Sequence, residues 1–219
     1  MKIYSLLCHP EENSLNGHLF KTANHWFESQ GHTVNNTHLL SIVPDLNNSA
    51  LALYSSDEAE LTSNGSNYRH NWANAKDRDL ISPTVQSEIQ KQKEADLFYI
   101  QTPIWLYSMP AMLKSYIEQI FLINEFFTLH NTGSATDFEV KHLIKNKRVI
   151  FCATTGGSEE MVANIVGGDS KYLIEPIKNI FEFIGFQFTP IMFWNVTDPA
   201  TKDQRNFSSE LTSKLAKLG

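Results

Sequence analysis

Short apolar runs that alternate with amphipathic segments are the feature that most constrains the fold of this 219-residue chain. Apolar, strand-like runs occupy positions 2–8, 33–39, 95–101, 147–154 and 186–194. Segments of helical periodicity alternate with them, starting at Asn13 or Ser14, Ser82-Pro83, Pro110, Ser170 and Thr201. Strands that alternate with helices favour a parallel sheet covered on both faces. The sequence therefore predicts a doubly wound α/β fold with five strands in the order 2-1-3-4-5.

Residues 1–219 are expected to form a single domain, because no linker separates a second hydrophobic core. Within it, residues 41–80 form a long polar excursion rich in Asn, Ser and Asp. An excursion of this length is typical of a functional wall or an oligomer arm, and disorder is the alternative.

Composition argues against several classes of function. The net charge is −6 and no basic run is present, so nucleic acid is not expected as a partner. No apolar stretch approaches ~18 residues, so membrane insertion is not expected and a cytoplasmic location is the default. Cys8 and Cys152 each lie in an apolar run, which favours two buried thiols over a disulfide or redox pair. No metal-ligand cluster is found.

In a doubly wound sheet, ligands bind beyond the carboxyl ends of the strands where the winding reverses. The loops after the first, third and fourth strands should therefore carry the chemistry. In the first loop, Ser14 and Asn16 lie at a helix start, where free N–H groups attract an anion. A simple helix cap explains these two residues equally well.

The second loop, residues 102–110, holds Trp105 and Tyr107 between two prolines. Large aromatic side chains in a loop indicate a flat ligand that stacks there, or a dimer contact. In the third loop, Gly156-Gly157 lets the backbone approach a ligand and offers N–H groups to negative charge, although a tight turn alone would also use glycine. Together the three loops suit a flavin.

Three stretches carry a resemblance to a known family: HPEENSLN from His9, TPIWLYSMPAMLKSYIEQIF from Thr102, and ATTGGS from Ala153 followed by IEPIKNIFEFIGF. In this order they resemble the flavodoxin-like NAD(P)H:quinone oxidoreductases. That family includes DT-diaphorase, the modulator-of-drug-activity type quinone reductases and the flavoprotein ancillary subunits of potassium efflux systems. The resemblance runs through nearly the whole chain.

The resemblance implies a flavodoxin-like fold, a homodimer, and ping-pong hydride transfer from NADH or NADPH through a flavin, more often FAD than FMN, to a quinone-like acceptor. Carried over by position, the cofactor-binding residues are His9, Ser14, Leu15, Asn16, Pro103, Ile104, Trp105, Leu106, Tyr107, Thr154, Thr155, Gly156 and Gly157. The catalytic set is Thr155, Gly156, Gly157 and Tyr107. The backbone groups of the first three are expected near flavin N1 and O2, where negative charge develops.

Departures from the family pattern concern the acid–base pair and the acceptor pocket. The Tyr and His that follow the Gly-Gly turn in DT-diaphorase-like enzymes correspond here to Val162 and to Gly167 or Gly168. The segment that closes the acceptor pocket from the partner subunit reads 125-EFFTLH-130 here. The expected acceptor pocket therefore holds Trp105, Phe126, Phe127, His130 and Val162. Because the acid–base pair is missing, a regulatory flavoprotein subunit of a membrane transporter with little turnover is the alternative to an enzyme.

Overall fold

The structure is a computed structural model that describes residues 1–43, 81–133, 137–198 and 206–218. Five parallel strands form one sheet in the order β2-β1-β3-β6-β7. Their bounds are β1 Lys2–Leu7, β2 Thr33–His38, β3 Leu97–Pro103, β6 Arg148–Thr154 and β7 Gln187–Phe193. The predicted five-stranded parallel sheet is confirmed. The last two labels are 6 and 7 because two strands outside this sheet intervene in the chain.

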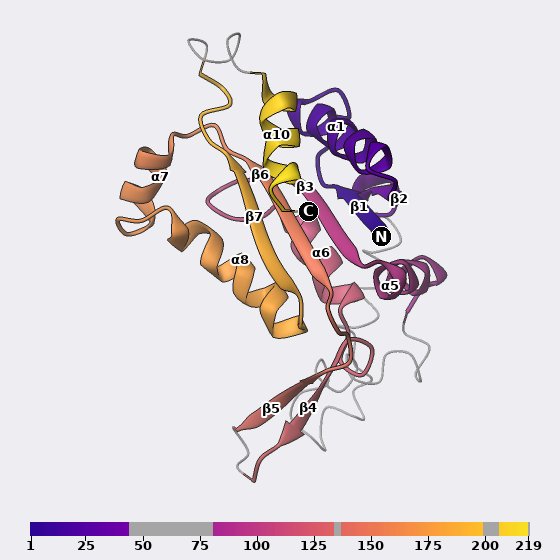
Figure 1. The fold of residues 1–219 in the computed structure, drawn as a ribbon. Coiled ribbons are helices and arrows are strands. Elements are labelled where there is room, and N and C mark those ends of the chain that lie inside the picture. Colours follow the sequence, from indigo (N-terminus) through magenta and orange to yellow (C-terminus); the bar gives the residue numbers. More distant parts are fainter. Residues whose placement is uncertain (44–80, 134–136, 199–205, 219) are drawn as a thin grey trace.

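Helices cover both faces of the sheet (Figure 1). One face packs against α5 (Pro83–Glu94), α6 (Ala111–Ile120) and α8 (Lys171–Ile184). The other face packs against α1 (Leu15–Ser29) and α10 (Phe207–Ala216). A short helix, α7 (Glu159–Val166), follows β6, and a 3₁₀ turn, η1 (Leu39–Ser41), follows β2. The excursion predicted for residues 41–80 lies, from residue 44 onward, outside the described residues.

Alternation along the strands explains why both faces are buried. In β1, Tyr4 and Leu6 face the α5–α6–α8 side, whereas Ile3 and Leu7 face the α1–α10 side, and all four are almost completely buried. Successive side chains of a strand point to opposite faces, so a continuous apolar run is needed where helices cover both. The apolar runs in the sequence therefore mark central strands.

Polar side chains cap the starts of the helices. Ser14, Ser82, Ser158 and Asn206 each accept a hydrogen bond from a backbone N–H of the first helical turn. Pro83 occupies the first position of α5, as expected, where the missing N–H costs nothing. The predicted helix starts at Ser14 and Ser82 are confirmed.

Two elements were not expected from the sequence, a hairpin and helix α7. Strands β4 (Phe127–Asn131) and β5 (Phe138–His142) pair antiparallel and project from the end of the sheet where the parallel strands begin (Figure 1). The hairpin is anchored by Phe126 and Phe127, both 0% exposed, whose rings pack against Phe121 and Phe183. Its strands are short and polar on their outer positions, so the alternation signal is weak.

Both cysteines are free and buried, as predicted. Burial raises the pKa of the Cys8 and Cys152 thiols to about 12. Neither thiol is therefore a nucleophile at neutral pH. Among the described residues, no helix has the length and apolar character needed to traverse a bilayer.

A buried carboxylate ties α5 to β1 and α6. Glu88 is 1% exposed and accepts hydrogen bonds from the hydroxyls of Tyr4 and Tyr116, and it pairs with Lys91. Burial, together with the nearby Glu88 charge, raises the pKa of Tyr4, which keeps its proton. Every oxygen of this carboxylate thus has a partner, as a buried charge requires.

The C-terminus of α8 yields a stability prediction. Gly185 ends the helix at φ +113°, and a Cβ there would lie 2.8 Å from the His142 ring of the hairpin. Gly31 also has positive φ, +77°, but a Cβ there meets nothing within 4 Å. We expect Gly31→Ala to lower the free energy of unfolding by about 1 kcal/mol through backbone strain alone. Gly185→Ala should lower it by about 2–3 kcal/mol, because the clash adds to the strain.

Urea denaturation of both variants measures the difference. Equal losses would show that the hairpin yields to the new methyl group, so that its contact with the end of α8 contributes nothing to stability.

Candidate functional site

The loops that follow β1, β3, β6 and β7 meet at one edge of the sheet, opposite the hairpin (Figure 1). Backbone hydrogen bonds of 2.8–2.9 Å join neighbouring strand ends: Cys8 N to Gln101 O, Ile104 N to Thr154 O and Thr155 N to Phe193 O. The ring centroids of His9 and Trp105, from the first and second loops, are 6.0 Å apart. The structure thus brings together the three loops that the sequence singled out.

The first loop folds tightly over the start of α1. The Ser14 hydroxyl accepts from the amide of Gly17 and donates to Glu11 O, so it is a helix cap. A Cβ on Gly17 would lie 1.9 Å from Glu12 O, so only glycine permits this close approach. The Glu12 carboxylate turns toward His38, with 3.1 Å between Oε1 and Nδ1. The negative charge of Glu12 is therefore directed toward His38.

His9 is half-buried in this loop with one ring nitrogen engaged. Its Nδ1 lies 3.0 Å from the amide N of Glu11 and 3.1 Å from Glu11 O. The carbonyl already accepts from the amide and hydroxyl of Ser14, whereas the amide can only donate. These contacts favour the tautomer with the proton on Nε2. His9 then offers a neutral donor beside the start of α1.

Asn16 lies in the first turn of α1 and its side chain is buried. Its side chain is 4% exposed, donates to Thr154 Oγ1 at 2.8 Å and accepts from Gln101 Nε2 at 2.8 Å. Both ends of the amide therefore have partners inside the protein. That Asn16 helps to line a bound flavin stays a prediction. The backbone N–H groups of Leu15 and Asn16, in the first turn of α1, have no intrahelical acceptor. These two amides are the backbone donors that an anion at this helix start could use.

The second loop is a strained turn. Trp105 and Ser108 exchange backbone hydrogen bonds of 2.9 and 3.0 Å around Leu106 and Tyr107, whose φ values are +47° and +59°. Such a turn normally uses Asn-Gly, because side chains with a Cβ cost roughly 1–2 kcal/mol each in the left-handed region. Leu106 is 96% exposed, and Trp105 and Tyr107 are 43% and 48% exposed. Strain and exposed aromatic rings together are typical of a binding loop.

The third loop offers fewer free N–H groups than the sequence predicted. The Thr155 amide donates to Phe193 O, and the Gly157 amide lies 3.3 Å from Thr155 Oγ1. Of the three amides predicted to face negative charge, only Gly156 N has no acceptor among the described residues. Neither glycine has positive φ. Instead, a Cβ on Gly157 would lie 2.3 Å from Met161 Cε, and one on Gly156 would lie 3.1 Å from Thr197 Oγ1.

A fourth loop, which was not assigned from the sequence, packs on the third. The Asn195 amide donates to Gly157 O at 2.9 Å and the Val196 amide to Thr155 O at 3.1 Å. The Thr197 hydroxyl donates to Gly156 O at 3.3 Å. Asn195 adopts φ +58°. The position of this loop directly after the last apolar run is the sequence signal that could have identified it.

The predicted acceptor-pocket residues are not brought together within one chain. Phe126 and Val162 are core residues at 0% and 2% exposure. Phe127 is also 0% exposed, but it lies at the end of an apolar hollow between α6 and α8 that Trp105 does not line. His130 is exposed on β4, in the hairpin at the opposite end of the sheet from the loops (Figure 1). Gly167 ends α7 with φ +112°. The positions of the missing acid–base pair thus carry no titratable group.

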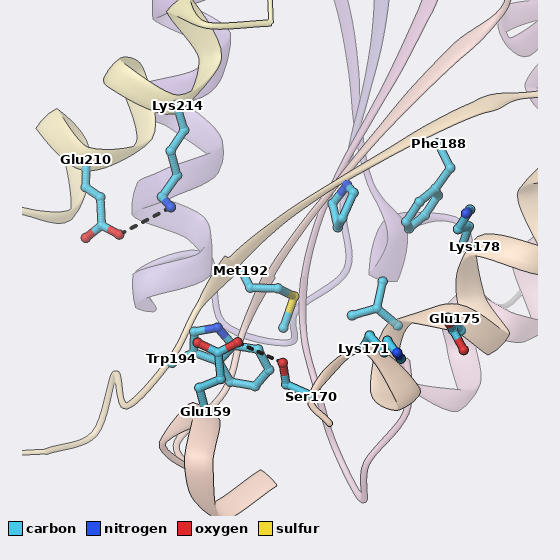
Figure 2. A pocket seen from close by; sticks show the side chains of 12 residues that line it. Glu159, Ser170, Lys171, Glu175, Lys178, Phe188, Met192, Trp194, Glu210 and Lys214 are labelled. Atoms are coloured by element: carbon cyan, nitrogen blue, oxygen red, sulfur yellow. Dashed lines mark hydrogen bonds and ion pairs between the residues drawn. The ribbon is translucent and has the colours of Figure 1, made fainter. Parts of the chain in front are cut away.

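Another hollow lies along the open side of β7 (Figure 2). It measures about 690 Å³ and is lined by Phe188 and Met192 of β7 and by Trp194 directly after this strand, with charged side chains around them. The three lysines among them are paired with neighbouring carboxylates: Lys214 with Glu210, Lys178 with Glu182, and Lys171 with Asp169. The Glu159 carboxylate accepts a hydrogen bond from the Ser170 hydroxyl. No residue predicted for the site lines this hollow. Its three lysines thus already have ionic partners within the chain.

A second hollow begins at the strained turn. Trp105, Leu106 and Ser108 line one side of it, and Ile177 and Ile180 of α8 line the other. An adjoining apolar hollow, which shares Lys114 and Ile180, continues between α6 and α8 to Phe127 and Phe183. Within the described residues, no group of three or more His, Cys, Asp or Glu side chains suits a metal ion.

Together, the parallel sheet and the loops at its carboxyl edge define a flavodoxin-like α/β protein. The family model described as "Flavodoxin-like fold" (Flavodoxin_2) matches residues 1–218. The chain therefore belongs to this family, and the predicted family resemblance is confirmed.

Proteins named for the reduction of quinones are among the relatives of this chain. The human protein "Ribosyldihydronicotinamide dehydrogenase [quinone]" is 26% identical over 211 residues, which cover 93% of this chain and 85% of the relative. A solved structure from Klebsiella pneumoniae, described as a candidate quinone reductase, superposes with a TM-score of 0.77 at 24% identity over 100% of this chain and 85% of that one. An FMN-dependent NADH-azoreductase from Bacillus anthracis in complex with FMN has a TM-score of 0.68 at 19% identity, covering 100% and 99%. The two structures show the likeness of fold.

The strained turn yields a prediction. We expect Leu106→Gly to raise the free energy of unfolding by about 1 kcal/mol, because glycine adopts φ +47° without steric conflict. Ser108→Gly, in the same loop at negative φ, should instead lower it by about 0.5 kcal/mol. Urea denaturation of the two variants tests this. A stability loss in Leu106→Gly would show that the turn stores no strain.

Proposed function

We propose that this protein is a flavin-dependent oxidoreductase that passes hydride from NADH or NADPH to a quinone or a similar small acceptor by a ping-pong mechanism. The observation that carries the proposal is the convergence at one sheet edge of the α1 start, the exposed Trp105–Tyr107 turn and the Gly156 loop. The names of the relatives point to the same chemistry. A cytoplasmic location belongs to this proposal.

The residues at this edge suit a flavin nucleotide. The first-turn amides of α1 and the Nε2–H of His9 supply neutral donors for a phosphate. The half-exposed rings of Trp105 and Tyr107 supply an apolar surface for a flat ring system. A phosphate seat is common to FMN and FAD, so the expectation of FAD over FMN stays a prediction. One structural neighbour was solved with FMN.

When held by the start of α1 and the Trp105–Tyr107 turn, a flavin would supply the hydride-transfer chemistry of the proposed reaction. The chain's own part is to bind, orient and exclude water. Trp105 and Tyr107 shape the cleft, and the Gly156 amide supplies the N–H that faces developing negative charge. The hydroxyl of Thr155, whose oxygen lies near the Gly157 amide, keeps its own proton for donation. At the positions of the family's acid–base pair, Val162 and Gly167 carry no titratable group.

The proposal predicts that purified protein is yellow or becomes so with FMN or FAD, and that it oxidises NADH or NADPH with a soluble benzoquinone. His9→Ala should weaken flavin binding about tenfold, since it removes one donor to a charged group. His25→Ala, on the exposed side of α1, is the matched control and should bind flavin as the parent does. Fluorescence titration of the apoprotein gives the dissociation constants.

Protein that stays colourless with both flavins would refute the proposal. Flavin bound tightly with negligible turnover would instead favour the regulatory subunit, because Val162 and Gly167 stand where the acid–base pair would be. Parallel lines in double-reciprocal plots at several acceptor concentrations are expected of the ping-pong order.

We further propose that the working form is a homodimer. The apolar hollows between α6 and α8 form a continuous strip from Leu106 to Phe183, which is itself 40% exposed. Exposed apolar strips of this kind mark protein contacts. His130 lies at the far end of the sheet from its own chain's loops, so only a second copy brings it near them.

Light scattering on a sizing column tests the dimer. Asn179→Arg places a charge in the strip at an exposed position and should convert the dimer to monomer. Gln30→Arg, at the exposed end of α1, is the control and should remain dimeric. A parent protein that elutes as a monomer at micromolar concentration would refute the dimer.

A further inference from the structure

A chain of buried polar side chains leads from the middle of the sheet to the candidate phosphate seat. The Tyr99 hydroxyl donates to Gln101 Oε1 at 2.7 Å, and Gln101 Nε2 donates to Asn16 Oδ1 at 2.8 Å. Asn16 Nδ2 then donates to Thr154 Oγ1 at 2.8 Å. All four side chains are at most 4% exposed. We call these four residues the buried amide chain.

The buried amide chain has a direction. An amide side chain donates only from nitrogen and accepts only at oxygen, so the orientation of one amide fixes the next. Because Thr154 Oγ1 accepts from Asn16, the proton of the Thr154 hydroxyl is left for another acceptor. No such acceptor is found among the described residues. Thr154 lies beside the first turn of α1, where the Leu15 and Asn16 amides also lack intrahelical acceptors.

The reverse direction uses the same atoms with both amides turned over. Thr154 would then donate to Asn16, and Tyr99 would donate to the sulfur of Cys152, with which it also interacts. An amide oxygen is a stronger hydrogen-bond acceptor than a thiol sulfur. The Tyr99 proton therefore selects the direction in which Thr154 remains a donor.

We infer that Gln101 and Tyr99 are positioning residues: through Asn16 they hold the Thr154 hydroxyl as a hydrogen-bond donor toward the phosphate of a flavin nucleotide at the start of α1. This inference rests on the proposed function. It also explains why Asn16 is buried and internally bonded although it lies at the helix start. Neither Gln101 nor Tyr99 is exposed enough to touch a ligand.

The experiment compares apoprotein affinity for FMN with affinity for riboflavin, which lacks the phosphate. Gln101→Met keeps the side-chain volume but removes both hydrogen bonds, and we expect FMN to bind about tenfold more weakly with riboflavin unchanged. Tyr99→Phe removes the Tyr99 hydroxyl and, with it, the proton that selects the direction. If the two directions become equally populated, FMN binds about twofold more weakly.

Matched controls lie on the other face of the sheet. Gln92 and Tyr116 are a buried glutamine–tyrosine pair, 3.1 Å apart, with no connection to Thr154. Gln92→Met and Tyr116→Phe should lower the melting temperature without changing the ratio of FMN to riboflavin affinity. These controls show how much the loss of a buried hydrogen bond changes stability alone. A change in the FMN to riboflavin ratio can then be assigned to positioning of the Thr154 hydroxyl.

A double variant makes the test decisive. In a Thr154→Val background the donor is gone, so Gln101→Met should weaken FMN binding no further. Equal losses for FMN and riboflavin in Gln101→Met, or a full additional loss in the Thr154→Val background, would overturn the inference while leaving the flavin proposal standing. A parent protein that binds neither compound overturns both.

Discussion

The parallel pairing of β3 with β1 on one side and β6 on the other is the constraint on which the rest of the structure depends. Its register sets Gln101 beside Leu7 and Cys152, and Pro103 beside Thr154. Strand ends therefore reach the same edge, and three loops distant in the sequence become neighbours. A slip of one residue would turn every side chain to the opposite face and separate Gln101 from Asn16.

The sheet, its two helical layers and several helix starts were predictable because their signals are local. Continuous apolar runs mark strands buried on both faces, and Ser14 and Ser82 mark helix starts by their hydroxyl groups. The position of the site at the carboxyl ends of the strands was predictable from the topology alone. The roles of individual residues within it did not.

Those roles depend on contacts between distant residues. Asn16 at a helix start looks the same in sequence whether it faces solvent or, as here, two buried partners 85 and 138 positions away. Gly156-Gly157 is explained by neighbours on α7 and the last loop, not by backbone conformation. The hairpin was missed because Phe126 and Phe127 read as pocket residues, whereas their rings belong to the core. Sequence patterns reveal the periodicity of helices and strands, whereas contacts between distant residues leave no periodic pattern.

One feature of the last strand bears on how the molecule behaves in a crowded solution. Gln187 N and Phe193 O point toward β6 and its loop, so the intervening alternate position, Pro190, faces the open side of the sheet. Proline has no N–H, so the outer side of this edge strand lacks one of the donors that a strand of another molecule would need to pair with it. The chain can thus leave a whole sheet edge uncovered and still resist growing into fibrils from that side.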